Sequence, residues 1–170
     1  LNNMKDRGIS KVLGLSLYPH YSRATSGSSI GELERCAEKL GLETLVIDSF
    51  PDHPGYVAAL ADIVQEGLKK VKDKQNFALV YSAHSLPKSM VEEGDPYVEH
   101  LYRTIMALEE LTGIKGHLCY QSRSGPVEWL EPGTDVLLNE LAEKGFHGLL
   151  VLPISFVSDH VETLYEIDML

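Results

Sequence analysis

The sequence KVLGLSL at residues 11–17 is an apolar run that predicts a buried β-strand. Residues 28–40 follow as a predicted helix, with an apolar face formed by Ile30, Leu33, Ala37 and Leu40. A second short apolar segment at residues 43–48 predicts another strand. A strand, a helix and a strand in this order predict a parallel pair joined by a right-handed crossover.

The same alternation continues along the chain. We expect further helices at residues 55–72, 96–111 and 134–144, and further strands at residues 77–82, 116–121 and 147–152. Asp95 is expected to cap the second of these helices, with Pro96 at its first position. Five strands that alternate with helices predict an α/β fold of parallel sheets flanked by helices.

Two similar halves are indicated by an internal repeat. GLSLYP at residues 14–19 recurs loosely as GLLVLP at residues 148–153, although any buried strand that ends in proline has this form. We expect residues 1–75 to hold the end of the first half and the crossover, and residues 76–170 to hold most of the second. The chain starts like the last turn of a helix and stops within another, so we expect a segment of a longer protein.

The composition excludes several classes of protein. The 170 residues are 44% hydrophobic and 24% charged, which is typical of a globular domain. A net charge of −10 argues against nucleic acid as a partner and leaves room for a cationic ligand such as a metal ion. The two cysteines, Cys36 and Cys119, lie far apart, which disfavours a disulfide scaffold or a thiolate zinc site and favours a reducing compartment. We see neither an apolar run of roughly 20 residues nor a signal peptide.

Ligands of open parallel sheets bind beyond the carboxyl ends of the strands, so the loops there are the candidate sites. His84 comes directly after the strand at residues 77–82, where an imidazole can take a proton or bind a metal ion. A lone histidine in this place is more often a structural residue. Ser85 beside it suggests a hydrolase, but no G-x-S-x-G turn occurs in the sequence.

The last segment carries three carboxylates on one helix face, because Asp159, Glu162 and Glu166 are spaced at i, i+3 and i+7. A solvated acidic helix start is the equally plausible interpretation. A histidine together with carboxylates suits a divalent first-row metal ion.

Three further candidates lie in other loops. The hydroxyl-rich residues 18–29 lead into a helix start, which suits either an anion or an ordinary serine cap. Trp129 is the only tryptophan and is able to stack on a flat ligand, although tryptophans more commonly pack in cores. His53 follows a strand and is interpreted as mainly structural.

Four strings of sequence together resemble a known family. They are LYPHYS with TSGS at residues 17–28, SAHSLP with GDPY at residues 82–97, YQSRSGP with WL at residues 120–130, and PISFVSDHVETLYEID at residues 153–168. In their order and spacing these strings resemble ferrochelatase. The resemblance covers the whole chain, whereas proteins of that family are considerably longer.

The resemblance implies two similar Rossmann-like α/β halves with a cleft between them, incomplete here at both ends. It implies a lyase of haem and porphyrin biosynthesis that inserts Fe²⁺ into protoporphyrin IX or coproporphyrin III. His84 and Glu162 then form the catalytic, metal-contacting pair. A proton or metal relay is implied for Asp159, His160 and Glu166, and a porphyrin pocket for Tyr18, Tyr21, Ser22 and Trp129.

The same resemblance bears on cofactors and location. Fe²⁺ is a substrate, no other cofactor is expected in this segment, and an iron–sulfur cluster stays open because its usual ligands lie outside it. The expected partners are porphyrin and iron, without nucleic acid or a transmembrane segment, but with room for peripheral membrane association. A cytoplasmic enzyme is expected, or an organellar one in a eukaryote. A related cobalt chelatase and a non-catalytic tetrapyrrole- or metal-binding module are the alternatives.

Overall fold

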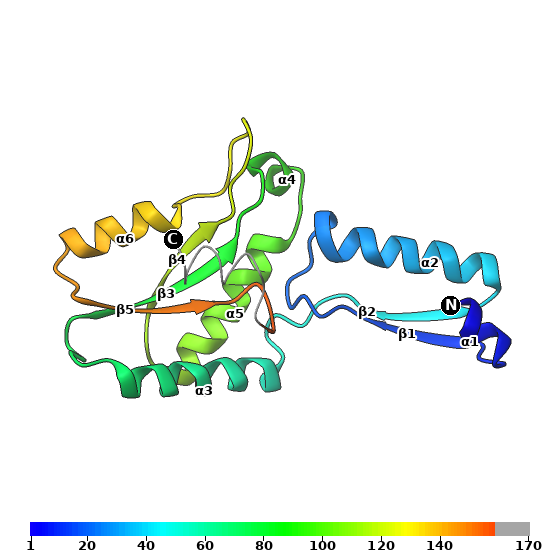
Figure 1. The fold of residues 1–170 in the computed structure, drawn as a ribbon, viewed down its shortest axis with the longest axis horizontal. Coiled ribbons are helices and arrows are strands. Elements are labelled where there is room, and N and C mark those ends of the chain that lie inside the picture. Colours follow the sequence, from blue (N-terminus) through cyan, green and yellow to red (C-terminus); the bar gives the residue numbers. More distant parts are fainter. Residues whose placement is uncertain (159–170) are drawn as a thin grey trace.

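The computed structural model describes residues 1–158, which form two parallel sheets with helices packed on them (Figure 1). The first part of the chain holds α1 (Asn2–Asp6), β1 (Lys11–Leu15), the π-helix η1 (Arg23–Gly27), α2 (Ser28–Leu40) and β2 (Glu43–Ile47). The remainder holds α3 (Pro54–Lys70), β3 (Phe77–His84), α4 (Lys88–Glu92), α5 (Tyr97–Thr112), β4 (Gly116–Gln121), α6 (Thr134–Glu143) and β5 (Gly148–Pro153). The predicted fold class, parallel sheets flanked by helices, is confirmed.

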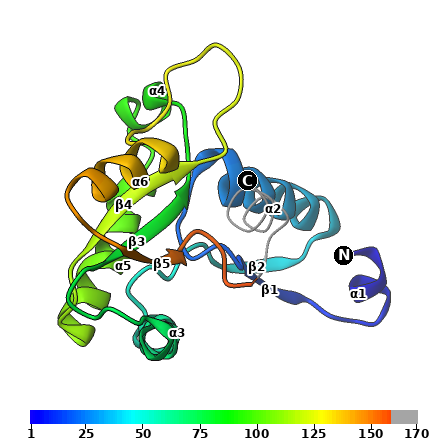
Figure 2. The ribbon, with the colours of Figure 1, turned by 60° about the vertical axis from the view of Figure 1, so that its left-hand side comes forward.

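The larger sheet has the strand order β4-β3-β5, with all three strands parallel. Helices α3 and α5 cover one face, and α6 covers the other (Figures 1 and 2). The central strand β3 is therefore shielded on both sides, and Leu79, Val80, Tyr81 and Ala83 are at most 1% exposed. An apolar strand of this kind is the expected consequence of helices on both faces.

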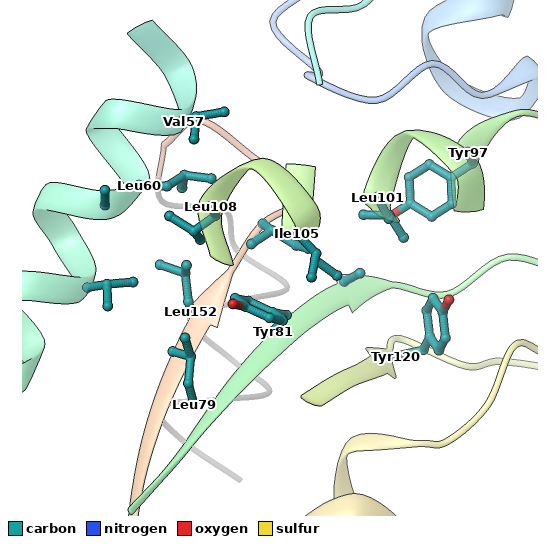
Figure 3. Close-up of a cluster of buried hydrophobic side chains, with 14 of the residues drawn as sticks. Val57, Leu60, Leu79, Tyr81, Tyr97, Leu101, Ile105, Leu108, Tyr120 and Leu152 are labelled. Atoms are coloured by element: carbon teal, nitrogen blue, oxygen red, sulfur yellow. The ribbon is translucent and has the colours of Figure 1, made fainter. Parts of the chain in front are cut away.

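The main core lies between this sheet and the α3–α5 layer. Figure 3 shows Leu60 of α3 and Leu108 of α5 beside Tyr81 and Leu152 of the sheet. Each aliphatic side chain buried in this way contributes on the order of 1.5–3 kcal/mol to folding. This core gives the site a rigid base, because β3 passes through it and ends at the functional loops.

Helix α3 belongs to this core although it precedes residue 75. Its side chains Val57, Leu60 and Val64 pack in the same cluster as Leu79 of β3. The predicted boundary at residue 75 stays a prediction, and the packing associates α3 with the three-stranded sheet. No helix within residues 1–158 is long and apolar enough to cross a bilayer.

The smaller sheet, β1 paired with β2, has one covered and one open face. Val12 is buried near Ala37 of α2, whereas the cross-strand pairs Leu13–Leu45 and Leu15–Ile47 are 42–69% exposed. The prediction that residues 11–17 form a buried strand is therefore wrong for half of its side chains. The reason is that, within residues 1–158, only the α2 side of this sheet is covered.

Candidate active site

A cavity of about 170 Å³ lies beyond the carboxyl ends of β1, β3 and β5. Its walls come from both parts of the chain, which are brought together by the loop at residues 16–22 and by the end of β3. The lining residues are Tyr18, His20, Ser22, Thr25, His84, Leu86, Tyr97, Ser155 and Phe156. Three predicted site residues, His84, Tyr18 and Ser22, thus share one cavity.

His84 is the last residue of β3, and its backbone is held by two side chains. The His84 N–H donates to Ser155 Oγ at 2.8 Å, and the Tyr97 hydroxyl donates to the His84 carbonyl at 3.0 Å. Burial raises the pKa of Tyr97, so its hydroxyl keeps the proton that it donates. The histidine therefore enters the cavity from a backbone that is fixed on both sides of its Cα.

The carboxylate of Asp95 anchors the opposite wall of the cavity. It accepts from the Ser22 hydroxyl at 3.0 Å, from the Arg23 N–H at 2.8 Å and from the Tyr97 N–H at 3.0 Å. Asp95 is only 4% exposed, so these three donors replace its lost hydration. One buried charge thus joins the loop that contains Ser22 to the first turn of α5.

Asp95→Asn should destabilise the protein by about 3 kcal/mol, because an amide NH₂ would then face backbone N–H or hydroxyl donors. The free energy of unfolding from urea titration of the full-length protein measures this change. The matched control is Asp52→Asn, which removes a carboxylate from the exposed ion pair with Arg103 and should cost about 1 kcal/mol or less. Equal losses in the two variants would contradict the anchoring role.

His20 forms a neutral, buried part of the cavity wall. Its Nε2 lies 2.8 Å from Thr104 Oγ1, whose own hydroxyl donates to the Pro51 carbonyl at 2.6 Å. Nε2 therefore carries the ring proton, and Nδ1 has no hydrogen-bond partner among residues 1–158. Burial, with a smaller contribution from His100, lowers the pKa of His20 to about 3.

His20 should make the protein sensitive to acid. The pKa of His20 is lower in the folded state than in the unfolded state. Below about pH 6.5 the unfolded chain therefore binds a proton at His20, whereas the folded chain does not. This group alone should lower the free energy of unfolding by about 2.5 kcal/mol between pH 7 and pH 4.5. Urea titrations at several pH values measure the slope, and His20→Gln should make it shallower. An unchanged slope in His20→Gln would refute the assignment.

Three other predicted residues lie outside the lining of the cavity. The Tyr21 N–H donates to Nδ1 of His100, whose pKa is lowered mainly by burial, so this nitrogen stays an acceptor. Trp129 forms an antiparallel bridge with Pro87, and its indole nitrogen is buried without a partner in the described part of the chain. His53 caps α3, where its Nδ1 accepts from the Gly55 N–H at 3.2 Å, in agreement with a structural role.

The acidic end of the predicted site falls outside the described residues. Asp159, His160, Glu162 and Glu166 all lie beyond residue 158, so the facing of His84 and Glu162 stays a prediction. Up to residue 158, no three histidine, cysteine, aspartate or glutamate side chains gather as a metal site. The two histidines among the cavity lining are His84 and His20.

Several lining residues lie in or beside the predicted loops or strings but were not singled out from the sequence: His20, Thr25, Leu86, Tyr97, Ser155 and Phe156. Ser155 offered a usable signal, because it is a hydroxyl residue two positions after a strand that ends in Pro153. Tyr97 stands in the GDPY part of one of the strings quoted above, but nothing in the sequence showed that its hydroxyl contacts His84.

A model of the ferrochelatase family matches residues 1–170. The chain belongs to the ferrochelatase family. It is 52% identical over 169 residues to the ferrochelatase of Geotalea uraniireducens, a match that covers 98% of this chain and 53% of that protein. The ferrochelatases of Desulfotalea psychrophila and Aquifex aeolicus are 51% and 41% identical, over 100% and 99% of this chain and 53% and 55% of theirs.

The chain thus spans about half the length of the curated ferrochelatases that it matches. The resemblance seen in the sequence is confirmed, and the cavity lies where three of its four strings meet, since Ser155 and Phe156 belong to the string that starts at Pro153. His84 comes from the SAHSLP string, while Tyr18 and Ser22 come from the LYPHYS string.

Proposed function

We propose that the full-length protein inserts Fe²⁺ into a porphyrin, either protoporphyrin IX or coproporphyrin III. The observation that carries this proposal is the position of His84, a strand-end imidazole in a cavity of a ferrochelatase-family chain. Insertion exchanges two pyrrole N–H protons for one metal ion, so the site must accept protons and supply the cation. An imidazole is suited to either task near neutral pH.

Our proposal divides the work between His84 and the acidic segment. His84 takes a pyrrole proton while Glu162 carries Fe²⁺, or the two exchange these roles. Asp159, His160 and Glu166 then serve as the relay that conducts protons or metal ions away from or toward the porphyrin. Carboxylates and imidazole are suitable ligands for ferrous iron.

The size of the cavity bears on how a porphyrin binds. About 170 Å³ is less than the roughly 300–1,000 Å³ of a pocket that encloses a whole ligand. We propose that the cavity receives the metal ion and the reacting edge of the macrocycle, with Tyr18 beside it. Tyr21 and Trp129 then contact outlying parts of the porphyrin.

The test is anaerobic turnover of the full-length protein with Fe²⁺ and each of the two porphyrins, followed by the absorbance of the metallated product. Iron insertion is the expected result. Turnover with Co²⁺ alone would indicate a cobalt chelatase, and porphyrin binding without any turnover would indicate a non-catalytic binding module.

We also propose that the protein acts in the cytoplasm or at the cytoplasmic surface of a membrane. Two observations support this: Cys36 and Cys119 are free thiols, and the related ferrochelatases named above come from bacteria. Cell fractionation with an antibody against the full-length protein tests the location.

A further inference from the structure

The hydrogen-bond ladder between β3 and β5 stops one step before His84. The Ile154 N–H still donates to the Ser82 carbonyl at 3.0 Å. In a regular parallel ladder the next bond would join the His84 N–H to the Ile154 carbonyl. Instead, the His84 N–H donates to Ser155 Oγ at 2.8 Å, and the Ile154 carbonyl accepts from the Tyr56 hydroxyl at 3.0 Å. Two side-chain hydroxyls thus replace one backbone bond, and the strands part at the cavity.

The number of hydroxyl protons available at this break allows one consistent set of hydrogen-bond directions. Tyr97 donates its hydroxyl proton to the His84 carbonyl at 3.0 Å and lies 2.7 Å from Ser155 Oγ. Because Tyr97 has only one hydroxyl proton, and that proton goes to the His84 carbonyl, Ser155 is the donor in its contact with the Tyr97 oxygen. The result is a closed ring of hydrogen bonds through His84, Ser155 and Tyr97.

This ring is shielded from water, which makes its geometry well defined. Tyr97 and Ser155 are each 6% exposed, and both line the cavity together with His84. They come from different elements, the first turn of α5 and the segment after β5. The backbone of His84 is therefore held from two directions by largely buried groups.

We propose that Tyr97 and Ser155 are positioning residues for His84, which fix its backbone so that the imidazole points into the cavity. This inference rests on the proposed function, in which His84 acts on a pyrrole proton or on the metal ion. A reacting group displaced by about 1 Å loses on the order of 10²-fold in rate, so the backbone beneath it matters. The hydroxyls touch His84 and need no contact with the substrates.

The test compares four variants of the full-length protein. Tyr97→Phe and Ser155→Ala remove the two hydroxyls that hold His84, and each should lower kcat by about 10-fold or more while the KM for porphyrin stays within about twofold. Ser155→Thr retains a hydroxyl and should recover most of the lost kcat. Tyr56→Phe is the matched control, because it removes a tyrosine hydroxyl from the other side of the same break, at Ile154. Its kcat should stay within about twofold of the original value.

A second measurement keeps this inference separate from the proposed function. Long-range proton–nitrogen NMR spectra show the imidazole of His84, and its signals are assigned by their loss in His84→Gln. Tyr97→Phe should shift or broaden these signals, whereas Tyr56→Phe should leave them in place. If the original protein inserts no iron, the proposed function is wrong and the spectra alone decide the positioning role. Equal effects of Tyr97→Phe and Tyr56→Phe on the spectra, or equal losses of kcat in these two variants, would overturn the positioning role of Tyr97.

Discussion

Replacing His84 by alanine in the full-length protein is expected to lower the turnover number for iron insertion by about 10²–10⁴-fold, the usual cost of losing a positioned acid–base group. Porphyrin affinity should change little, because apolar and stacking contacts supply most of it. Steady-state turnover and quenching of protein fluorescence by porphyrin measure the two quantities separately.

His147→Ala is the matched control for this experiment. His147 is an exposed histidine that precedes β5, at the end of the sheet opposite the cavity, so its loss should leave turnover within about twofold. If His84→Ala abolished porphyrin binding instead of turnover, the histidine would hold the substrate and would not act on protons or metal. Such a result would leave the cavity as a binding site and would remove the chemical role proposed for it.

Glu162→Gln is expected to reduce turnover by about 10²-fold, since the amide keeps the shape of the side chain and removes the charge that attracts Fe²⁺. The KM for Fe²⁺ should rise as well, because the neutral amide is a weaker ligand for a divalent cation. Glu166→Gln is the matched control: it makes the same chemical change four residues further along the sequence, which is about one turn of the predicted helix, and its loss should be about 10-fold or less.

Turnover at several Fe²⁺ concentrations distinguishes the two carboxylates. A loss in Glu166→Gln as large as that in His84→Ala, with unchanged porphyrin affinity, would show that the acidic residues do not form a graded track toward the porphyrin. The proposed pairing of His84 with Glu162 would then need to be replaced.

Local sequence patterns predicted most of the fold. The bounds of α2 and β4 agree with their predictions, and α2 ends where Gly41 adopts a left-handed conformation. Strand β3 extends two residues further than predicted, to His84, since its ladder with β4 continues as far as Gln121. The π-helix η1 was missed, because its geometry depends on the contact of Ser22 with the distant Asp95.

The site was predicted only in part, for a related reason. His84 is a polar residue at a strand end, which a sequence reveals directly, whereas Tyr18 and Ser22 were predicted from the family resemblance. Ser155 and Tyr97 contact the His84 backbone from positions 71 and 13 residues away along the chain, and these contacts follow from the packing of β5 and α5. The open face of the smaller sheet likewise depends on which elements pack against the sheet. An apolar pattern within the strands, whether alternating or continuous, does not specify which elements those are.

The parting of β5 from β3 also constrains the order in which this protein can assemble during synthesis. Strand β4 pairs with one edge of β3, and β5 pairs with the other edge. Of the strands described, β5 is the last to leave the ribosome. Because synthesis runs from the N-terminus, the residues of α3, β3, α5 and β4 leave the ribosome before Ser155 does. The backbone of His84 acquires its second support only when that serine arrives. A nascent chain that ends before residue 155 therefore lacks the support that Ser155 gives to the His84 backbone. We expect the imidazole of His84 to be positioned for chemistry only after synthesis has passed that residue.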